Sequence, residues 1–186
     1  MQPVREKDLL RTITRVVNTL RRAGLRFAVA GGCAAYARGG PPSEHDVDVF
    51  LKKDDVPAAR AALVAEGMTP VDPPEDWLTK VYDGDLLVDL IFCPHGEPVT
   101  DEMLARTEEM RIGAATAPVL TGTDLMVDKL MVLGPHRCDF TPLLRIAREL
   151  REQVSWSEVA ERTKESPYAK AFLTLVRELG VAEPGV

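Results

Sequence analysis

Residues 30–50, AGGCAAYARGGPPSEHDVDVF, constrain the fold of this chain more than any other stretch. An apolar run ends in Gly31 and Gly32, which predicts a strand followed by a tight turn into a short helix. After a Gly/Pro-rich turn, Asp46 and Asp48 alternate with apolar residues, which predicts a second strand with both carboxylates on one face. Two like charges this close are unfavourable unless a cation lies between them. The stretch therefore predicts a strand–turn–helix–strand unit that carries a cation site.

A third acid strengthens this interpretation. Asp89 lies in the middle of LLVDLIF, where an unpaired carboxylate is costly. Three carboxylates suit Mg²⁺, which binds oxygen ligands together with substrate phosphates, and the glycines let the backbone approach a phosphate. Each feature also has a simpler explanation. The D-x-D pair can be the solvent face of an edge strand, Asp89 a hydrogen-bonded core acid, and the glycine pair an ordinary turn.

Composition narrows the class of protein. The chain has 186 residues, of which 45% are apolar and 28% charged, with a net charge of −6. Such a chain can bury one good-sized core, and it does not coat nucleic acid through bulk charge. Three cysteines without CxxC spacing predict reduced thiols, and the charged N-terminus and short apolar runs predict no signal peptide and no membrane partner. We therefore expect a cytoplasmic protein.

Hydrophobic spacing changes character near residue 120. We expect an α/β unit over 1–120 and a helical region over 121–186. The expected helices cover 5–23, 33–38, 56–66, 100–106, 123–133, 140–152, 156–164 and 167–179, and the expected strands cover 25–30, 46–52, 68–71, 77–83, 85–92 and 108–120.

The spacing of the glycines and acids resembles the signature of the polymerase-β-like nucleotidyltransferase superfamily. Ala30-Gly31-Gly32 is followed, after thirteen residues, by Asp46-Val47-Asp48-Val49, and Asp89 matches the third acid in type and context. The resemblance implies an α+β fold: a mixed β-sheet with flanking helices, followed by a C-terminal helical bundle.

Two further motifs are similar to those of the small bacterial toxin nucleotidyltransferases of the AbiEii and MenT kind. One is Lys129 in TDLMVDKLMVL, which matches an E/D-K-apolar motif. The other is Asp139 in HRCDF, although the second acid of that motif is missing and Leu143 stands nearby. Lys129 can equally be a solvated helix lysine, and Asp139 can be an N-terminal helix cap.

The resemblance implies the reaction and its residues. A substrate hydroxyl attacks the α-phosphorus of an NTP and releases pyrophosphate, with two Mg²⁺ ions at the acids. The implied catalytic residues are Asp46, Asp48, Asp89, Lys129 and Asp139, and the implied metal ligands are Asp46, Asp48 and Asp89. The implied nucleotide-binding residues are Gly31, Gly32, Arg38, Ser43 and Lys129. Arg38 can also be a solvated surface arginine.

The acceptor is suggested by charge and by the toxin resemblance together. Residues 1–26 carry seven positive and two negative charges, and Arg11, Arg15 and Arg22 share a helical face. This face predicts either an RNA-binding surface or the solvated side of an amphipathic helix. The resemblance favours tRNA 3′ ends as acceptor and an antitoxin protein as partner. An antibiotic- or protein-modifying nucleotidyltransferase and an inactive nucleotide-binding regulator are the alternatives.

Overall fold

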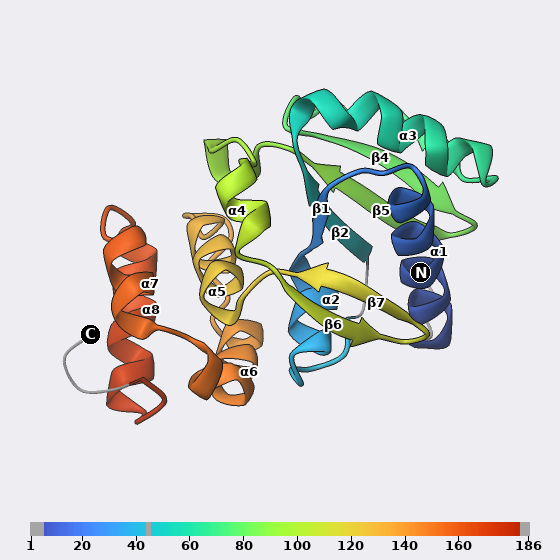
Figure 1. The fold of residues 1–186 in the computed structure, drawn as a ribbon. Coiled ribbons are helices and arrows are strands. Elements are labelled where there is room, and N and C mark those ends of the chain that lie inside the picture. The colour runs from blue at the N-terminus through green and yellow to red at the C-terminus, as the bar shows by residue number, and fades with distance from the viewer. Residues whose placement is uncertain (1–5, 44–45, 183–186) are drawn as a thin grey trace.

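A computed structural model describes residues 6–43 and 46–182, so Arg5 of the basic N-terminal segment lies outside the described residues. Within these ranges the chain forms a seven-stranded mixed sheet in the order β3-β4-β5-β2-β1-β7-β6 (Figure 1). The pairs β2–β5 and β1–β7 are parallel and the other pairs are antiparallel. The strands are β1 (Phe27–Val29), β2 (Asp46–Leu51), β3 (Thr69–Val71), β4 (Leu78–Asp83), β5 (Leu86–Ile91), β6 (Glu108–Ile112) and β7 (Ala115–Val119).

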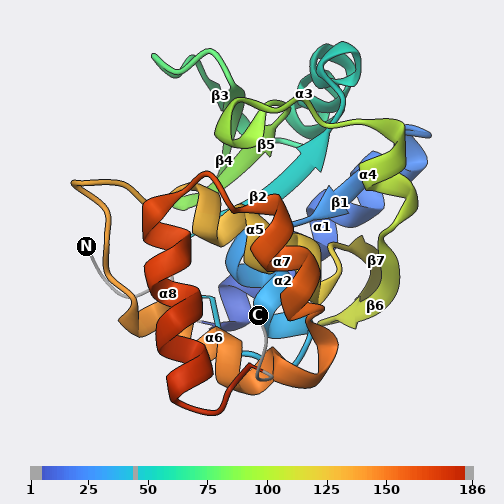
Figure 2. The same cartoon turned by 90° about the vertical axis from the view of Figure 1, so that its left-hand side faces the viewer.

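Helices cover both faces of the sheet. α1 (Glu6–Arg22) and α3 (Val56–Ala65) pack on one face, and α2 (Gly31–Ala37) and α5 (Gly122–Met131) lie on the other (Figure 1). Figure 2 shows the last helices in front of α5, on the side away from the sheet. The remaining helices are α4 (Asp101–Ala105), α6 (Thr141–Leu150), α7 (Trp156–Arg162) and α8 (Pro167–Glu178).

The long helix α1 is fixed by its apolar stripe. Leu9, Ile13, Val16, Val17 and Leu20 recur at three- and four-residue spacing and are all buried. This spacing places them on one face of a helix, where they cover the sheet. α1 thereby closes one face of β2 and β5, which leaves the polar side chains of these strands on the opposite face.

The sequence predicted the helices and most strands within a few residues. The prediction of a single strand over 108–120 is wrong. This run is a hairpin of β6 and β7 that turns at Gly113, whose φ is +59°. A glycine readily adopts this left-handed conformation, so an apolar run with one internal glycine can fold back on itself. The short helix expected from residue 33 begins earlier, at Gly31.

The change of character near residue 120 is visible as a change of elements. β7 ends at Val119, and every later element among the described residues is helical, apart from an isolated bridge between Gly134 and Arg137. The mixed sheet with flanking helices and a helical C-terminal part is the predicted fold class. A division into domains 1–120 and 121–186 stays a prediction. In the described part of the chain, no helix combines the length and the apolar character needed to cross a membrane.

Candidate active site

Three carboxylates from two neighbouring strands meet on one face of the sheet. Because β2 and β5 are parallel with Asp48 opposite Asp89, and because Asp46 and Asp48 point the same way, all three side chains converge. One carboxylate oxygen from each lies within 4.8 Å of the other two. The flanking Val47 and Val49 are buried in the core. The alternation of apolar and acidic residues in β2 thus brings the acids together.

The ionised forms of Asp48 and Asp89 are unfavourable in this environment. Burial, and then the charges of Asp46 and Asp89, raise the pKa of Asp48 from 3.8 to about 8. Burial also raises the pKa of Asp89 from 3.8 to about 6, although Lys80 lowers it in part. The buried Oδ1 of Asp89 has no hydrogen-bond partner among the described residues. Because a buried polar atom normally has a partner, this oxygen is available to a ligand.

These three residues fit a hard divalent cation. The donor set consists of carboxylate oxygens alone, which suits Mg²⁺ better than a metal that prefers nitrogen or sulfur. A cation at this point would remove the mutual repulsion that raises the pKa values, and it would provide a partner for the free Oδ1 of Asp89. Asp46, Asp48 and Asp89 are therefore the residues that would hold a divalent cation.

The glycine pair lies directly against this cluster. Gly31 has a φ of +56°, and a Cβ there would lie 1.7 Å from Oδ2 of Asp48. A Cβ on Gly32 would lie 2.3 Å from Oγ of Ser43. The N–H of Ala30 donates to the carbonyl of Asp48 over 2.9 Å, which ties the glycine turn to β2. The structure therefore brings Gly31, Gly32 and Ser43 to the acids.

Lys129 also belongs to this region. It is half-buried on α5, and its charge lowers the pKa of both Asp48 and Asp128. It makes no hydrogen bond or ion pair with any described residue. Burial raises the pKa of Asp128, while Lys129, His95 and Arg137 lower it in part. A half-buried ammonium without a direct partner next to the acids is available to a phosphate.

Arg38 has its interactions elsewhere. Its Nε donates to the carbonyl of Leu120 over 2.5 Å, Nη1 to Gln153 over 3.1 Å, and Nη2 to Glu108 over 2.7 Å. The side chain is only 3% exposed, so the interpretation as a solvated surface arginine is wrong. The three guanidinium nitrogens join the C-terminal end of α2 to β6, to Leu120 directly after β7, and to the segment before α7. The structure gives Arg38 a structural role, and a contact to phosphate stays a prediction.

Asp139 lies two residues before α6, whose N-cap is Phe140. Its Oδ1 accepts a hydrogen bond from the N–H of Thr141 over 2.9 Å, which is an Asx-turn contact that leads into the helix, so the structure does not make Asp139 the N-cap. A catalytic role for Asp139 stays a prediction. Cys33 lies behind the acids, and burial, followed by the charges of Asp48 and Asp46, raises the pKa of its thiol to about 12. This thiol stays protonated and is inert.

Three neighbours of the site were not predicted. Lys80 pairs with Asp89 across the β4–β5 hairpin, a register that the Asp83-Gly84 turn would have given. Asp128 is the acid of the E/D-K-apolar motif in TDLMVDKLMVL, but a role was predicted for Lys129 alone. His95 has a φ of 42°, the one positive value of a non-glycine residue in the ranges that the structure describes, and its buried Nδ1 has no partner there. No local pattern predicts this conformation.

Solved structures with the same fold belong to nucleotidyltransferases. The antibiotic-resistance factor ANT(2'')-Ia matches 95% of this chain and 99% of its own, with a TM-score of 0.68 and 14% identity. The lincosamide antibiotic adenylyltransferase LnuA matches 82% of this chain and 100% of its own, with a TM-score of 0.55 and 12% identity.

An antigenic nucleotidyltransferase-like protein from Paracoccidioides brasiliensis matches 93% of this chain and 95% of its own, with a TM-score of 0.52 and 13% identity. No family model and no curated protein sequence matches the chain. At these identities the likeness concerns the fold. The chain has the nucleotidyltransferase fold.

Proposed function

We propose that the protein transfers a nucleoside monophosphate from an NTP to a hydroxyl group of an acceptor, with the help of Mg²⁺. The observation that carries this proposal is the meeting of three acids within 4.8 Å, beside a glycine turn and a free lysine. The raised pKa values of Asp48 and Asp89 indicate a site that is electrostatically incomplete without a cation.

Each acid has a role in this proposal. Asp46, Asp48 and Asp89 hold Mg²⁺ through their carboxylate oxygens. When bound, magnesium lowers the pKa of the attacking hydroxyl and stabilises negative charge on the phosphates. Asp89 lies on β5, on the side of β2 away from the glycine turn that follows β1, so its carboxylate is placed toward the acceptor.

The proton of the acceptor hydroxyl needs a base. As the hydroxyl oxygen forms a bond to the α-phosphorus, the bond to the bridging oxygen breaks and pyrophosphate leaves. Asp89 is the carboxylate placed on the acceptor side, and its Oδ1 has no hydrogen-bond partner among the described residues, so it is positioned to take this proton.

The phosphates of the NTP lie on the glycine side of the acids. The first N–H groups of a helix have no carbonyl partner within the helix, and those of α2 begin at Gly31 and Gly32. The hydroxyl of Ser43 lies against Gly32, and the ammonium of Lys129 acts on Asp48 from α5. Together they provide neutral donors and one positive charge for a triphosphate.

The acceptor has two candidates. A tRNA 3′ end, with a toxin role and an antitoxin partner, is the proposal from the sequence motifs. A hydroxyl of an antibiotic is the second, and it is favoured by the match to ANT(2'')-Ia and LnuA over nearly the whole length of those proteins. The alternatives that the protein modifies another protein, or that it is a regulator without turnover, are tested by the labelling experiment described next.

The test is an incubation with α-³²P-labelled NTPs and Mg²⁺, separately with total tRNA, aminoglycosides, lincosamides and a cell lysate. We expect label in one acceptor, none with EDTA, and a rate more than about 100-fold lower for Asp48→Asn. Asp54→Asn, a change of an exposed acid in the turn before α3, is the control and retains full activity. Activity that survives Asp48→Asn, or label in no acceptor, would contradict the proposal.

A further inference from the structure

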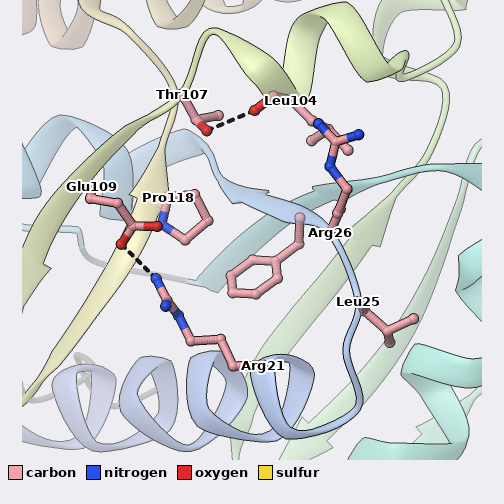
Figure 3. A pocket seen from close by; sticks show the side chains of 8 residues that line it. Arg21, Leu25, Arg26, Leu104, Thr107, Glu109 and Pro118 are labelled. Atoms are coloured by element: carbon pink, nitrogen blue, oxygen red, sulfur yellow. Dashed lines mark hydrogen bonds and ion pairs between the residues drawn. The ribbon is translucent and has the colours of Figure 1, made fainter.

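The arginines near the N-terminus do not form a free basic surface. Each arginine between residues 6 and 26 is paired with an acid. Figure 3 shows one such pair, in which Arg21 points toward Glu109 at the rim of a cavity of about 280 Å³. The pairs are Arg11–Asp8 at 4.0 Å, Arg15–Asp83, Arg21–Glu109 at 2.5 Å, Arg22–Glu66 at 2.6 Å and Arg26–Asp101 at 2.7 Å.

The cavity of Figure 3 also lies away from the candidate active site. It is bordered by Phe27, where β1 begins, whereas Gly31 follows the other end of β1. Arg21 and Arg26, which line this cavity, are therefore paired with acids and lie toward the end of β1 that is away from Gly31. The ion pairs compensate part of the positive charge of the N-terminal segment, which weakens its interpretation as an RNA-binding surface.

Two arginines on α6 differ from those of α1. Arg145 and Arg148 are exposed and stand three residues apart, so they share a helix face. Neither has an ion pair or hydrogen bond with any residue that the structure describes, although Glu149 stands four residues after Arg145. Their guanidinium groups are therefore free to bind an anion.

These arginines line a groove with the loop that follows α2. The groove has a volume of about 370 Å³ and is lined by Gly39, Gly40, Pro41, Arg145, Arg148 and Glu149. The loop packs closely on α6, because a Cβ on Gly40 would lie 3.2 Å from Cδ1 of Leu150 and 2.8 Å from the carbonyl of Ala35. The groove thus lies between two segments that pack against each other.

The same loop leads into the candidate active site. Two residues after Pro41 comes Ser43, whose hydroxyl lies against Gly32 at the start of α2. Two residues of extended chain span at most about 7 Å. A chain of phosphates that begins at the acids can therefore continue into the groove within a few nucleotides.

We propose that the groove between α6 and residues 39–41 binds the phosphodiester backbone of an RNA acceptor whose 3′ end lies at the acids. Guanidinium groups bind phosphate through two parallel N–H···O bonds, which suits Arg145 and Arg148 to this contact. Glu149 repels the same backbone and limits its affinity. The inference rests on the proposed function for the position of the 3′ end, and it names RNA as the substrate class.

The test measures binding of fluorescein-labelled tRNA by fluorescence anisotropy over a series of salt concentrations. For Arg145→Ala/Arg148→Ala we expect a Kd about tenfold higher at low salt. The slope of log K against log salt should fall by about 1.4, since each contact to a single strand contributes about 0.7. Glu149→Gln should tighten binding. The matched control is Arg21→Ala/Arg22→Ala, two arginines already paired with acids, whose affinity should stay unchanged.

Several outcomes would overturn the inference: an unchanged Kd and slope for the α6 variant, an equal loss for the α1 variant, or no binding of tRNA by the wild-type protein. Circular dichroism melts check that each variant is folded. RNA binding through α6 in a protein that transfers no nucleotide would refute the proposed function alone, and transfer to an antibiotic without RNA binding would refute this inference alone.

Discussion

Among the described residues, two of the places that bury aspartate treat it in opposite ways. Asp124, at the start of α5, receives hydrogen bonds from Arg106 over 2.9 and 3.1 Å and an ion pair from Arg162 over 2.8 Å. Burial alone would raise the pKa of Asp124, but the hydrogen bonds from Arg106 and Arg162 outweigh it and hold the pKa below its ordinary value. At the acids of β2 and β5, burial and like charges act together and raise the pKa values.

The difference separates a paired acid with a structural role from acids that the fold leaves without a compensating charge. Arg106 follows α4, Arg162 ends α7 and Asp124 begins α5, so this paired carboxylate joins three parts of the fold. The acids at the glycine turn join nothing by themselves and cost stability while they are ionised. A site that binds a cation benefits from this arrangement, since the cation is bound where the protein has left charge uncompensated.

The largest expected effect is on the pH dependence of stability in EDTA. Asp48 and Asp89 bind protons more tightly in the folded chain than in the unfolded chain. Their protonation therefore contributes to the free energy of unfolding fully below about pH 4, and this contribution is lost as pH rises toward 8. Asp124 acts in the reverse sense: its contribution is present above pH 4 and is lost as pH falls through its lowered pKa. Urea unfolding at a series of pH values measures both changes in stability: the decline between pH 4 and 8 and the loss below pH 4.

Two variants assign these changes in stability to their residues. Asp48→Asn should flatten the decline between pH 4 and 8 and leave the loss below pH 4 unchanged. Asp124→Asn should remove the loss below pH 4 and leave the decline between pH 4 and 8 unchanged. An identical pH profile for both variants would show that the two environments do not differ as described.

The second effect is protection by Mg²⁺. A ligand at 100 times its Kd stabilises the folded state by about 2.7 kcal/mol, provided that it does not bind the unfolded chain. We expect this gain in the wild type and in Asp124→Asn, and we expect Asp48→Asn to lose most of it. Thermal unfolding with and without Mg²⁺ at neutral pH measures the gain, and equal protection of all three proteins would place the metal elsewhere.

The smallest effect is the loss of the structural acid. Asp124→Asn removes the charge that two arginines share, and breaking a buried pair costs about 3–5 kcal/mol. Because Arg106 is 44% exposed and Arg162 is 30% exposed, water can solvate them, and we expect a loss of about 2 kcal/mol. Urea unfolding at neutral pH checks this value, and a variant as stable as the wild type would show that the ion pairs contribute nothing.

The sequence predicted the parts of the site that depend on local pattern. Alternation in β2 placed Asp46 and Asp48 on one face, and the apolar surroundings of Asp89 marked it as exceptional. Arg38 was harder to interpret, since its partners Leu120 and Gln153 lie 82 and 115 residues away in the chain. A local pattern contains no information about such contacts.

The same reason explains the basic N-terminal helix. The spacing of Arg11, Arg15 and Arg22 predicted a shared charged face, but the acidic partners of Arg15 and Arg22 lie 68 and 44 residues further along the chain. Whether a charged face is free or neutralised depends on the tertiary structure. Charge counting within one segment therefore left open whether this face binds RNA or is the solvated side of the helix.

The close approach of Gly31 to Asp48 has a consequence for how this protein can vary. Any side chain at position 31 would occupy the space of the Asp48 carboxylate, 1.7 Å from its Oδ2, and would also have to adopt an unfavourable backbone conformation. Substitution of the glycine therefore acts as an indirect substitution of the acid. In a saturation-mutagenesis library selected for activity, positions 31 and 48 should tolerate change equally poorly, because a substitution at either position disturbs the same carboxylate.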